Sequence, residues 1–473
     1  MTNENKPNEN KTTRKNNTGG NVLASGGFGC VFSPALKCEG EKHREKNKVS
    51  KLMTERHAIK EYEEINIFKE KLDTIPDYKD YYLIYDTTLC RPAKMTATDL
   101  SNYSKKCSAL SKINITKQNI NDNNDKLMLL NMPKGGLAVD DYIYQNGSFK
   151  KLYILHKRLI QLFKNGVIPM NSKNIFHSDI KDSNVLVDES APELKTRLID
   201  WGLSTEYKPF HDEPFPIVWR NRPFQFNVPF SVIIFTDYFI EKYSEFIKND
   251  GRYKDEEYLK PFVLDYITSW MNERGAGHYK FINEIMYILF SKSLVNVPLH
   301  SKPKVIETEF TMPYIINYIV RILIKYTKFR KNGNVHLRKY LDNVFIKNVD
   351  VWGFISVYFP MLELLYDNYN KLSDKERELF EVLKNIFINL YSTSDEAINK
   401  DELLSKFNEM ERIIYHINLN FSKRDKRHNV TKYSKDKGSG IKTRKYKKKS
   451  KVSFKRRPKQ KRFKKPVFLL IRQ

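Results

Sequence analysis

Apolar residues recur at helical spacing in three separate segments of this 473-residue chain. The segments are residues 57–72, residues 152–162 and residues 315–326. The segment 152–162 predicts a helix that ends near Gly166. Spacing of three or four positions places one face of a helix against a core. The stripes consist of Ala58, Tyr62, Ile65, Phe68 and Leu72; of Leu152, Leu155, Leu159 and Leu162; and of Ile315, Tyr318, Ile319, Ile322, Leu323 and Tyr326.

Shorter apolar runs predict strands between these helices. Val22-Leu23 and Val31-Phe32 flank a glycine-rich turn, and an apolar/polar alternation follows at residues 49–52. The runs 127–130, 184–188 and 197–200 are also typical of short strands. Towards the end, Ser373 and Glu376 form a capping box ahead of a helix, and another helix is expected from about Asp401. The chain is therefore expected to be of the α+β class.

Two polar segments adjoin the predicted strands at residues 184–188 and 197–200. The first is His177-Ser178-Asp179-Ile180-Lys181-Asp182-Ser183-Asn184, and Asp200-Trp201-Gly202 begins 16 residues after Asn184. The oxygens of Asn184 and Asp200 are hard donors that suit Mg²⁺. A carboxylate, a lysine and two metal ligands are what phosphoryl transfer from a nucleotide requires, because catalysis consists mainly of positioning and neutralising the phosphate. A polar surface loop with turn-forming residues is the simpler alternative.

These two segments resemble the catalytic loop and the metal-binding turn of the protein kinase superfamily. The resemblance implies ATP and Mg²⁺ as cofactors. It implies that Asp179 orients the substrate hydroxyl and accepts its proton, and that Lys181 contacts the γ-phosphate. Asn184 and Asp200 are the implied metal ligands. The position of Lys181, two residues after Asp179, favours serine and threonine over tyrosine as substrates.

The segment 24–31 looks like the glycine-rich loop of the same family. Backbone amides at Gly26, Gly27 and Gly29 are expected to approach phosphate oxygens closely. Ala24 occupies the position of the family's first glycine, and Val31 that of the residue covering the adenine. A flexible hairpin turn is the alternative explanation for this composition.

Lys51 resembles the strand lysine that binds the α- and β-phosphates. A kinase holds this lysine with a glutamate from the following helix, and we expect Glu64 in that role, with Glu61 and Glu70 as alternatives. The strand at residues 127–130 is expected to run into the hinge at residues 131–134. Leu130 is then the gatekeeper residue, and the backbone of Asn131 and Met132 reads the adenine.

Further downstream, Asp350 in Val-Asp-Val-Trp-Gly resembles the aspartate that braces the catalytic loop, although an acidic helix cap is also compatible with it. Three departures from the family are evident. Ser178 replaces the arginine that pairs with a phosphorylated activation loop, so we expect activity not to depend on such phosphorylation. Trp201 replaces the usual phenylalanine. Residues 222–229 stand where Ala-Pro-Glu is expected, which leaves the substrate groove undefined.

The resemblance implies a bilobal protein-kinase-like fold with a small β-rich N-lobe and a large, mostly helical C-lobe. We expect a disordered N-terminus at residues 1–18 and the N-lobe at residues 19–134. An insert at residues 87–126, rich in Asn, Lys, Ser and Thr, is expected to be a mobile surface loop. The C-lobe spans residues 135–421 and includes a long helical insert at about residues 232–345. Residues 422–473 form a basic tail that we expect to be disordered.

This tail holds most of the charge of the chain. Residues 422–473 contain 23 Lys and Arg against 2 Asp, which is +21 of the formal net charge of +27. Such a segment binds polyanions through counterion release, so nucleic acid, an acidic protein surface and a nuclear import receptor are the candidate partners. A solvated tail without a dedicated ligand is the alternative.

Four cysteines without a Cys-x-x-Cys pair, and the lack of a secretory leader, favour a reducing compartment and disfavour a zinc site. No transmembrane span is indicated. The combined motifs resemble serine/threonine kinases of large nucleocytoplasmic DNA viruses, which implies an intracellular location in the host cytoplasm or the virion, with nuclear import as an option. An active serine/threonine kinase is thus the favoured interpretation. The alternatives are a catalytically silent nucleotide-binding scaffold and a basic virion protein that binds nucleic acid through its tail.

Overall fold

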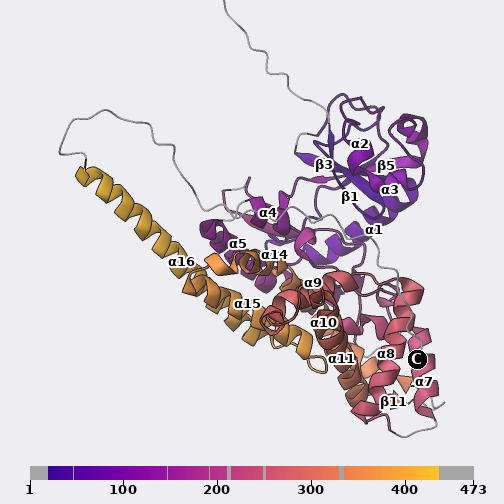
Figure 1. The fold of residues 1–473 in the computed structure, drawn as a ribbon. Helices are drawn as coiled ribbons and strands as arrows, with labels where there is room; N and C mark the ends of the chain where they lie inside the picture. Colours follow the sequence, from indigo (N-terminus) through magenta and orange to yellow (C-terminus); the bar gives the residue numbers. More distant parts are fainter. Residues whose placement is uncertain are drawn as a thin grey trace, which may run out of the picture. The chain divides into compact units, whose positions relative to one another are not determined.

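The structure is a computed structural model that describes residues 20–45, 47–145, 148–190, 192–209, 215–248, 252–329 and 335–435, with side chains up to residue 419. The chain divides into two compact units. Within the described residues, unit 1 consists of residues 20–69 and 84–134, and unit 2 of residues 70–83 and those from 135 on (Figure 1). Helix α1 (Glu55–Leu72) contributes residues to both units. The predicted segment 1–18 and the tail from residue 436 lie outside the described residues.

Unit 1 is built around an antiparallel sheet with the strand order β1-β2-β3-β5-β4. The strands are β1 (Asn21–Ser25), β2 (Gly29–Ser33), β3 (Lys48–Thr54), β4 (Thr88–Cys90) and β5 (Leu127–Pro133). A short 3₁₀ helix, η1 (Tyr78–Asp80), belongs to the part of unit 2 that separates α1 from β4. The strands predicted on both sides of the glycine-rich turn, around Lys51 and before the hinge are therefore all present.

The insert at residues 87–126 is not the mobile surface loop that its polar composition suggested. It forms α2 (Tyr103–Lys106), α3 (Ser108–Ser111) and η2 (Ile120–Lys126), and it packs on the sheet of unit 1. The prediction was wrong because a few apolar residues, widely spaced among Asn, Lys and Ser, all point into one core. Those side chains from the insert are Met95, Leu100, Tyr103, Cys107, Ala109, Leu110, Ile115 and Ile120.

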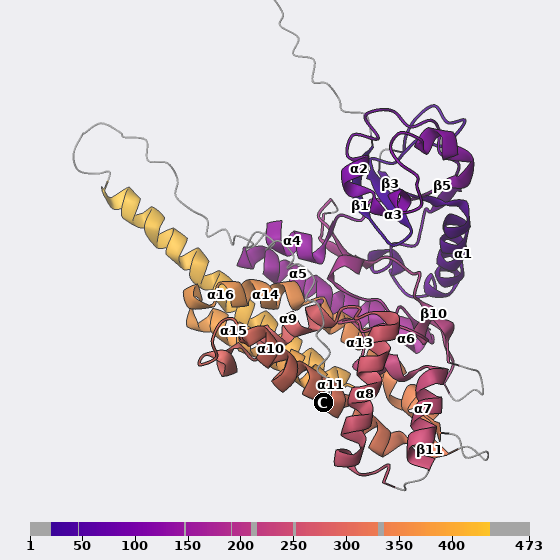
Figure 2. The same ribbon diagram turned by 45° about the vertical axis from the view of Figure 1, so that its right-hand side comes forward.

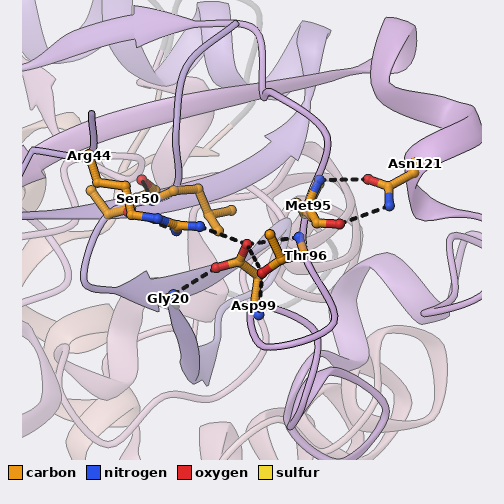
Figure 3. A network of polar contacts seen from close by, with 9 residues as sticks. Gly20, Arg44, Ser50, Met95, Thr96, Asp99 and Asn121 are labelled. Carbon is orange, nitrogen blue, oxygen red and sulfur yellow. Dashed lines mark hydrogen bonds and ion pairs between the residues drawn. The ribbon is translucent and has the colours of Figure 1, made fainter. Parts of the chain in front are cut away.

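A buried carboxylate ties this insert to the strands. Asp99 is 1% exposed and accepts hydrogen bonds from the Gly20 backbone N (2.7 Å), from Arg44 Nη2 (2.8 Å) and from both the backbone N and Oγ1 of Thr96 (Figure 3). Nearby, the side chain of Asn121 pairs with both the backbone N and O of Met95. The insert is thus held by polar contacts as well as by its apolar core.

All four cysteines form disulfides within unit 1. Cys30 of β2 is bonded to Cys107, and Cys38 is bonded to Cys90 of β4. Sequence spacing did not indicate either pair, because the partners are 77 and 52 residues apart. The inference of a reducing compartment assumed unpaired thiols, and that assumption was wrong; the compartment itself stays a prediction.

Unit 2 begins with short strands and a long helical segment. These elements are β6 (Leu137–Ala138), α4 (Val139–Gln145), α5 (Phe149–Gln161), η3 (Leu162–Val167), α6 (Ile168–Ser172), β7 (Ile175–Phe176), η4 (Asp182–Asn184), β8 (Val185–Asp188), β9 (Lys195–Leu198) and β10 (Thr205–Glu206). The predicted helix does not end near Gly166, because helical backbone continues to Ser172. Gly166 instead allows a close approach of Tyr81, and its carbonyl accepts a hydrogen bond from Tyr82.

The remainder of unit 2 is mostly helical. It contains η5 (Ile217–Trp219), η6 (Phe230–Ile234), α7 (Asp237–Lys248), α8 (Glu256–Arg274), α9 (Tyr279–Leu289), η7 (Ser291–Leu294), α10 (Lys302–Val305), η8 (Ile306–Thr311), α11 (Met312–Tyr326), β11 (Lys328–Phe329), β12 (Val335–His336), α12 (Arg338–Tyr340), η9 (Leu341–Phe345), α13 (Ile346–Ser356), α14 (Phe359–Asp367), η10 (Tyr369–Lys371), α15 (Asp374–Ser392) and α16 (Lys400–Lys435). The predicted stripe from Ile315 to Tyr326 is buried, and the capping box of Ser373 and Glu376 is confirmed. Figures 1 and 2 show α15 and α16 side by side, and the predicted boundary near residue 421 falls inside α16.

One stretch of the described chain, Arg338–Asp367, has the length and apolar composition of a membrane-spanning helix. Its most apolar window is 89% buried inside the fold. A core helix of a globular unit passes the same test of length and composition, so this stretch is weak evidence for a membrane span.

Candidate active site

Four residues expected to contact a nucleotide form one row across the sheet of unit 1. Ala24 of β1 lies opposite Val31 of β2, Val31 opposite Lys51 of β3, and Lys51 opposite Leu130 of β5. Directly opposed residues of antiparallel strands project from the same face of the sheet. The other face carries Cys30, Leu52 and Leu129 and is covered by the insert. The row therefore lies on the sheet face that does not bear the insert.

Lys51 is held by Glu61 and not by Glu64, which was the expected partner. Its Nζ lies 2.6 and 2.7 Å from the two carboxylate oxygens of Glu61. Glu61 stands between Ala58 and Ile65 on the buried side of α1, whereas Glu64 is turned by about 60° around the helix and contacts Lys60 at 3.6 Å. The prediction of Glu64 was wrong because it inferred the side of the helix that faces the core from the apolar residues that follow Glu64.

The glycine-rich turn is closed by its own backbone, since Gly26 N donates to Gly29 O at 2.8 Å. A Cβ on Gly29 would lie 2.6 Å from Leu52 O, so this glycine is required by close packing. A Cβ on Gly27 would meet nothing within 4 Å, which leaves this backbone open for an approaching ligand. Ser25 Oγ accepts a hydrogen bond from Ala109 N at 3.0 Å, so the insert also supports the turn.

The residues expected in the hinge lie at the end of β5. The side chain of Asn131 is buried on the insert side of the sheet and accepts a hydrogen bond from Ser50 Oγ. Met132 lies opposite Val49 and is half-buried. Because the Asn131 side chain points away from the Lys51 row, any contact of this residue with a nucleotide on that row has to come from its backbone, as the sequence predicted.

In unit 2, the predicted catalytic residues converge on Asp179, which is 5% exposed. Oδ2 of Asp179 accepts hydrogen bonds from Lys181 Nζ at 2.7 Å and from Asn184 Nδ2 at 2.9 Å. Asn184 Nδ2 also donates to the backbone oxygen of Asp179 at 2.8 Å. The 3₁₀ helix η4 produces this convergence by folding Asn184 back over the loop. The amide nitrogen of Asn184 is thereby directed to Asp179, and its carbonyl oxygen to the opposite side.

Burial alone would raise the pKa of Asp179, but this pKa is lowered below its ordinary value of 3.8 by Lys181, Asn227 and Arg222. The carboxylate is therefore ionised at neutral pH, as a group that orients a hydroxyl and accepts its proton has to be.

The second predicted metal ligand is brought next to the first by the backbone. Ile199 N donates to Asn184 O at 3.0 Å, which fixes β9 and the following Asp200 beside the catalytic loop. Asp200 has φ = 67°, a left-handed conformation that is uncommon outside glycine and marks a sharp turn. Trp201 is buried and packs against His177 and Tyr82, with ring centroids 4.9 and 5.8 Å apart. The bulkier aromatic is thus accommodated in the core of unit 2.

The predicted brace of the catalytic loop is confirmed. Asp350 of α13 is fully buried, and its carboxylate accepts hydrogen bonds from the backbone N of His177 (2.9 Å) and Ser178 (2.7 Å) and from Asn171 Nδ2 (2.7 Å). Burial raises the pKa of Asp350, while His177, Ser178 and Asn171 oppose this change. Gly353 follows Asp350 by three residues in the same helix. A side chain at this position would place its Cβ 2.7 Å from Ile180 O. Helix α13 can therefore approach the loop this closely because residue 353 is glycine.

Three residues that sequence reasoning did not assign also contact the loop. Asn227 Nδ2 donates to Asp179 Oδ1 at 2.9 Å, Arg222 Nη1 donates to Ser178 O at 3.0 Å, and Trp219 Nε1 donates to Ser178 Oγ at 2.9 Å. Arg222 and Asn227 belong to the segment 222–229, whose departure from Ala-Pro-Glu was noted in the sequence, and Trp219 lies in η5 just before it. In the sequence, the one signal that other groups have to support this loop was Ser178, which stands where the resembling family has an arginine.

The donor set fits a magnesium ion. Asn184 offers a carbonyl oxygen and Asp200 a carboxylate, and both are hard ligands of the kind Mg²⁺ prefers. Two protein ligands are enough for Mg²⁺, because it keeps several positions for water and phosphate oxygens.

Comparisons with known proteins agree with this geometry. The model of the family described as protein kinase domain matches residues 101–217, which include the catalytic loop and the Asp200 turn. Calcium-dependent protein kinase 5 of Plasmodium berghei (strain Anka) is 35% identical over 86 residues, covering 18% of this chain and 15% of the relative. Calcium-dependent protein kinase 5 of Plasmodium falciparum (isolate 3D7) is 32% identical over 85 residues, with the same coverage. The matches thus span about 15% of the length of these curated relatives, and they support a relationship to the protein kinase superfamily.

Proposed function

We propose that this chain is an ATP-dependent protein kinase that transfers the γ-phosphate to serine and threonine hydroxyls. The observation that carries the proposal is the ordered environment of Asp179, whose buried carboxylate is bonded to Lys181 and Asn184. A surface loop with turn-forming residues would not bury these groups against one another. Selection of serine and threonine is supported by Lys181, which occupies the position that distinguishes such kinases in the resembling family.

In the proposed mechanism, Asp179 orients the substrate hydroxyl and accepts its proton as the oxygen attacks. Lys181 places a positive charge beside Asp179, where it neutralises charge on the transferred phosphoryl group. When bound, ATP supplies the phosphoryl group and Mg²⁺ screens its charge. The Asn184 carbonyl and the Asp200 carboxylate would hold the ion.

The sheet of unit 1 supplies the nucleotide contacts in this proposal. Lys51, fixed by Glu61, binds the α- and β-phosphates, and the backbone at Gly26, Gly27 and Gly29 covers them. Val31 flanks Lys51 in the same row and offers an apolar surface to the adenine, while Leu130 on the other side of Lys51 is fully buried.

The test is incorporation of labelled phosphate from ATP into a basic or neutral test protein, followed by identification of the modified residues. Asp179→Asn and Lys51→Met should each lower kcat by about 10² or more. Asp265→Asn, which removes an exposed carboxyl group from α8, is the control and should leave the rate unchanged. Near-normal turnover of Asp179→Asn would refute the assignment. Nucleotide binding without any transfer by the wild type would instead establish the silent scaffold.

The basic tail adds a proposed partner. Residues 422–473 carry a net charge of +21, and Tyr446, Phe454 and Phe463 lie within or close to the basic runs. We propose that the tail binds a polyanion, with nucleic acid as the first choice because aromatic side chains can stack on bases. Deletion of the residues after 435 should abolish salt-sensitive DNA binding while phosphate transfer survives. The resemblance to viral kinases, and with it a location in host cytoplasm or virion, stays a prediction.

A further inference from the structure

Ser178, the residue in front of Asp179, has all three of its polar groups bonded to different elements. Its backbone N donates to Asp350 Oδ1 at 2.7 Å, its Oγ accepts from Trp219 Nε1 at 2.9 Å, and its backbone O accepts from Arg222 Nη1 at 3.0 Å. Ser178 has φ = 59°. A non-glycine residue in this region is strained and persists only where its surroundings determine it. Trp219 and Arg222 therefore help to hold the strained residue that aims Asp179.

The carboxylate of Asp179 is held on both oxygens by different parts of the chain. Oδ2 is bonded by Lys181 and Asn184 of its own loop. Oδ1 is bonded by Asn227 Nδ2, which also donates to Ile180 O at 3.2 Å and is fully buried. Asn227 thereby adds a second point of attachment that restricts rotation of the carboxylate.

Arg222 brings a buried positive charge to the same place. Arg222 is only 6% exposed, and its positive charge attracts the carboxylates of Asp179 and Asp350. Burial lowers the pKa of Arg222 to about 10, against the opposing effect of these two carboxylates, so the guanidinium remains charged at neutral pH. A fixed arginine is thus present beside the loop, although the residue before Asp179 is a serine.

The segment that carries Arg222 and Asn227 is itself fixed by the long insert and by α13. Its carbonyl groups at every second residue accept hydrogen bonds from these elements. The bonds are Trp270 Nε1 to Arg222 O (3.1 Å), His278 N to Phe224 O (2.7 Å) and Trp352 Nε1 to Phe226 O (2.9 Å). Trp270 belongs to α8 and His278 precedes α9, so the insert has a direct structural role at the catalytic loop.

We infer that Arg222 and Asn227 are positioning residues for Asp179, held in place by the insert, and that they replace an arginine paired with a phosphorylated activation loop. The inference rests on the proposed kinase activity. It explains how an ordered catalytic loop exists without an arginine at position 178. It also assigns a role to α8 and to the turn before α9.

The consequence is a specific pattern of kinetics. Neither residue lies on the Lys51 row, so loss of either side chain should leave KM for ATP nearly unchanged. A misplaced carboxylate should lower kcat, because a displacement of about 1 Å can cost 10²-fold in rate. A residue that only stabilised the fold would lower the amount of folded enzyme without changing kcat per folded molecule.

The experiment compares two variants with matched controls from the same segment of the full-length chain. Arg222→Met and Asn227→Leu remove the two donors while keeping similar side-chain size. Arg220→Met and Gln225→Leu are the controls, since Arg220 bonds Phe215 and Asp237 and not the catalytic loop. Arg222→Lys is the conservative variant and should recover part of the lost rate. Each protein is assayed for kcat, KM for ATP and melting temperature, and wild type is also assayed after phosphatase treatment.

The expected result is a fall in kcat of about tenfold or more for Arg222→Met and Asn227→Leu, with KM within about twofold and unaffected controls. Phosphatase-treated wild type should keep its rate. Wild-type kcat in both variants, while Asp179→Asn is inactive, would overturn this inference and leave the kinase proposal intact. An inactive wild type would refute the kinase proposal itself. If Arg222→Met does not fold, Asn227→Leu and Arg222→Lys decide the question by the same criteria.

Discussion

The carboxylate of Asp350 bonds the backbone nitrogen of Ser178 at 2.7 Å across 172 residues of sequence. Its second oxygen bonds His177 N and Asn171 Nδ2, so one buried side chain receives three donors. Because Ser178 is in a left-handed conformation, the loop would relax if these bonds were lost. The position of Asp179 thus depends on a residue of a distant helix.

Asp350→Asn should therefore lower both stability and activity. An amide retains one acceptor oxygen but turns an NH₂ group towards backbone donors, and each buried donor left unpaired costs about 1–3 kcal/mol. We expect a clearly lower melting temperature and a loss of phosphate transfer beyond the loss of folded protein. Asp265→Asn on the exposed side of α8 is the matched control. An unchanged melting temperature in Asp350→Asn would contradict the role of this carboxylate.

The pair of Lys51 and Glu61 leads to a second prediction. Glu61→Gln removes the charge that fixes Lys51 and should reduce kcat/KM by about tenfold or more, since the lysine loses its position. Glu64→Gln is the matched control, because Glu64 lies on the same helix and contacts Lys60. Steady-state kinetics with ATP as the varied substrate distinguish the two. Equal losses in both variants would argue against the assignment of Glu61.

These cases show which features a single sequence can reveal. The strands around the glycine-rich turn, the buried stripe of α11 and the loop from His177 to Asn184 were predictable, because each depends on neighbouring residues. Glu61 was missed although it lies between Ala58 and Ile65 on the buried side of α1, because Glu64 was chosen from the apolar residues that follow it. The role of Asn227 was not predictable either, because it lies in an irregular segment and contacts Asp179 from 48 positions away.

The insert of unit 1 illustrates the same limit in another way. Its polar composition is typical of mobile loops, but a small set of apolar residues such as Leu100 and Ile115 was sufficient to cover a sheet face. The disulfides are equally non-local, because Cys30 and Cys107 become neighbours only after the insert has folded back on β2.

The disulfides predict that unit 1 is sensitive to reduction. Closing loops of 77 and 52 residues restricts the unfolded chain, and each bridge contributes about 4 kcal/mol in the chain-entropy model. The paired variant Cys38→Ser with Cys90→Ser should therefore unfold at lower temperature than wild type without reductant. Wild type treated with dithiothreitol should show a similar or larger decrease. Mass spectrometry after alkylation provides the control, and four alkylated thiols in native, unreduced protein would contradict the pairing.

The Asp99 carboxylate predicts a dependence of stability on pH. Burial would raise its pKa, but hydrogen bonds from Arg44, Thr96 and Gly20 lower it below the ordinary value of 3.8. A carboxyl group with a lowered pKa stabilises the fold above the pKa of the unfolded chain, and this contribution disappears as pH falls through the folded value.

Asp99→Asn should thus unfold more easily than wild type near neutral pH, by about 2–3 kcal/mol, because Arg44 loses its anionic partner. The difference should begin to shrink below about pH 4, where the unfolded chain takes up a proton, and should disappear as pH falls through the lowered pKa of folded Asp99. Urea unfolding at several values between about pH 7 and about pH 3 measures this, and Asp122→Asn, an exposed carboxyl of the same insert, should track wild type throughout. A difference that stayed constant over the whole range would show that the ionised form of Asp99 contributes nothing to stability.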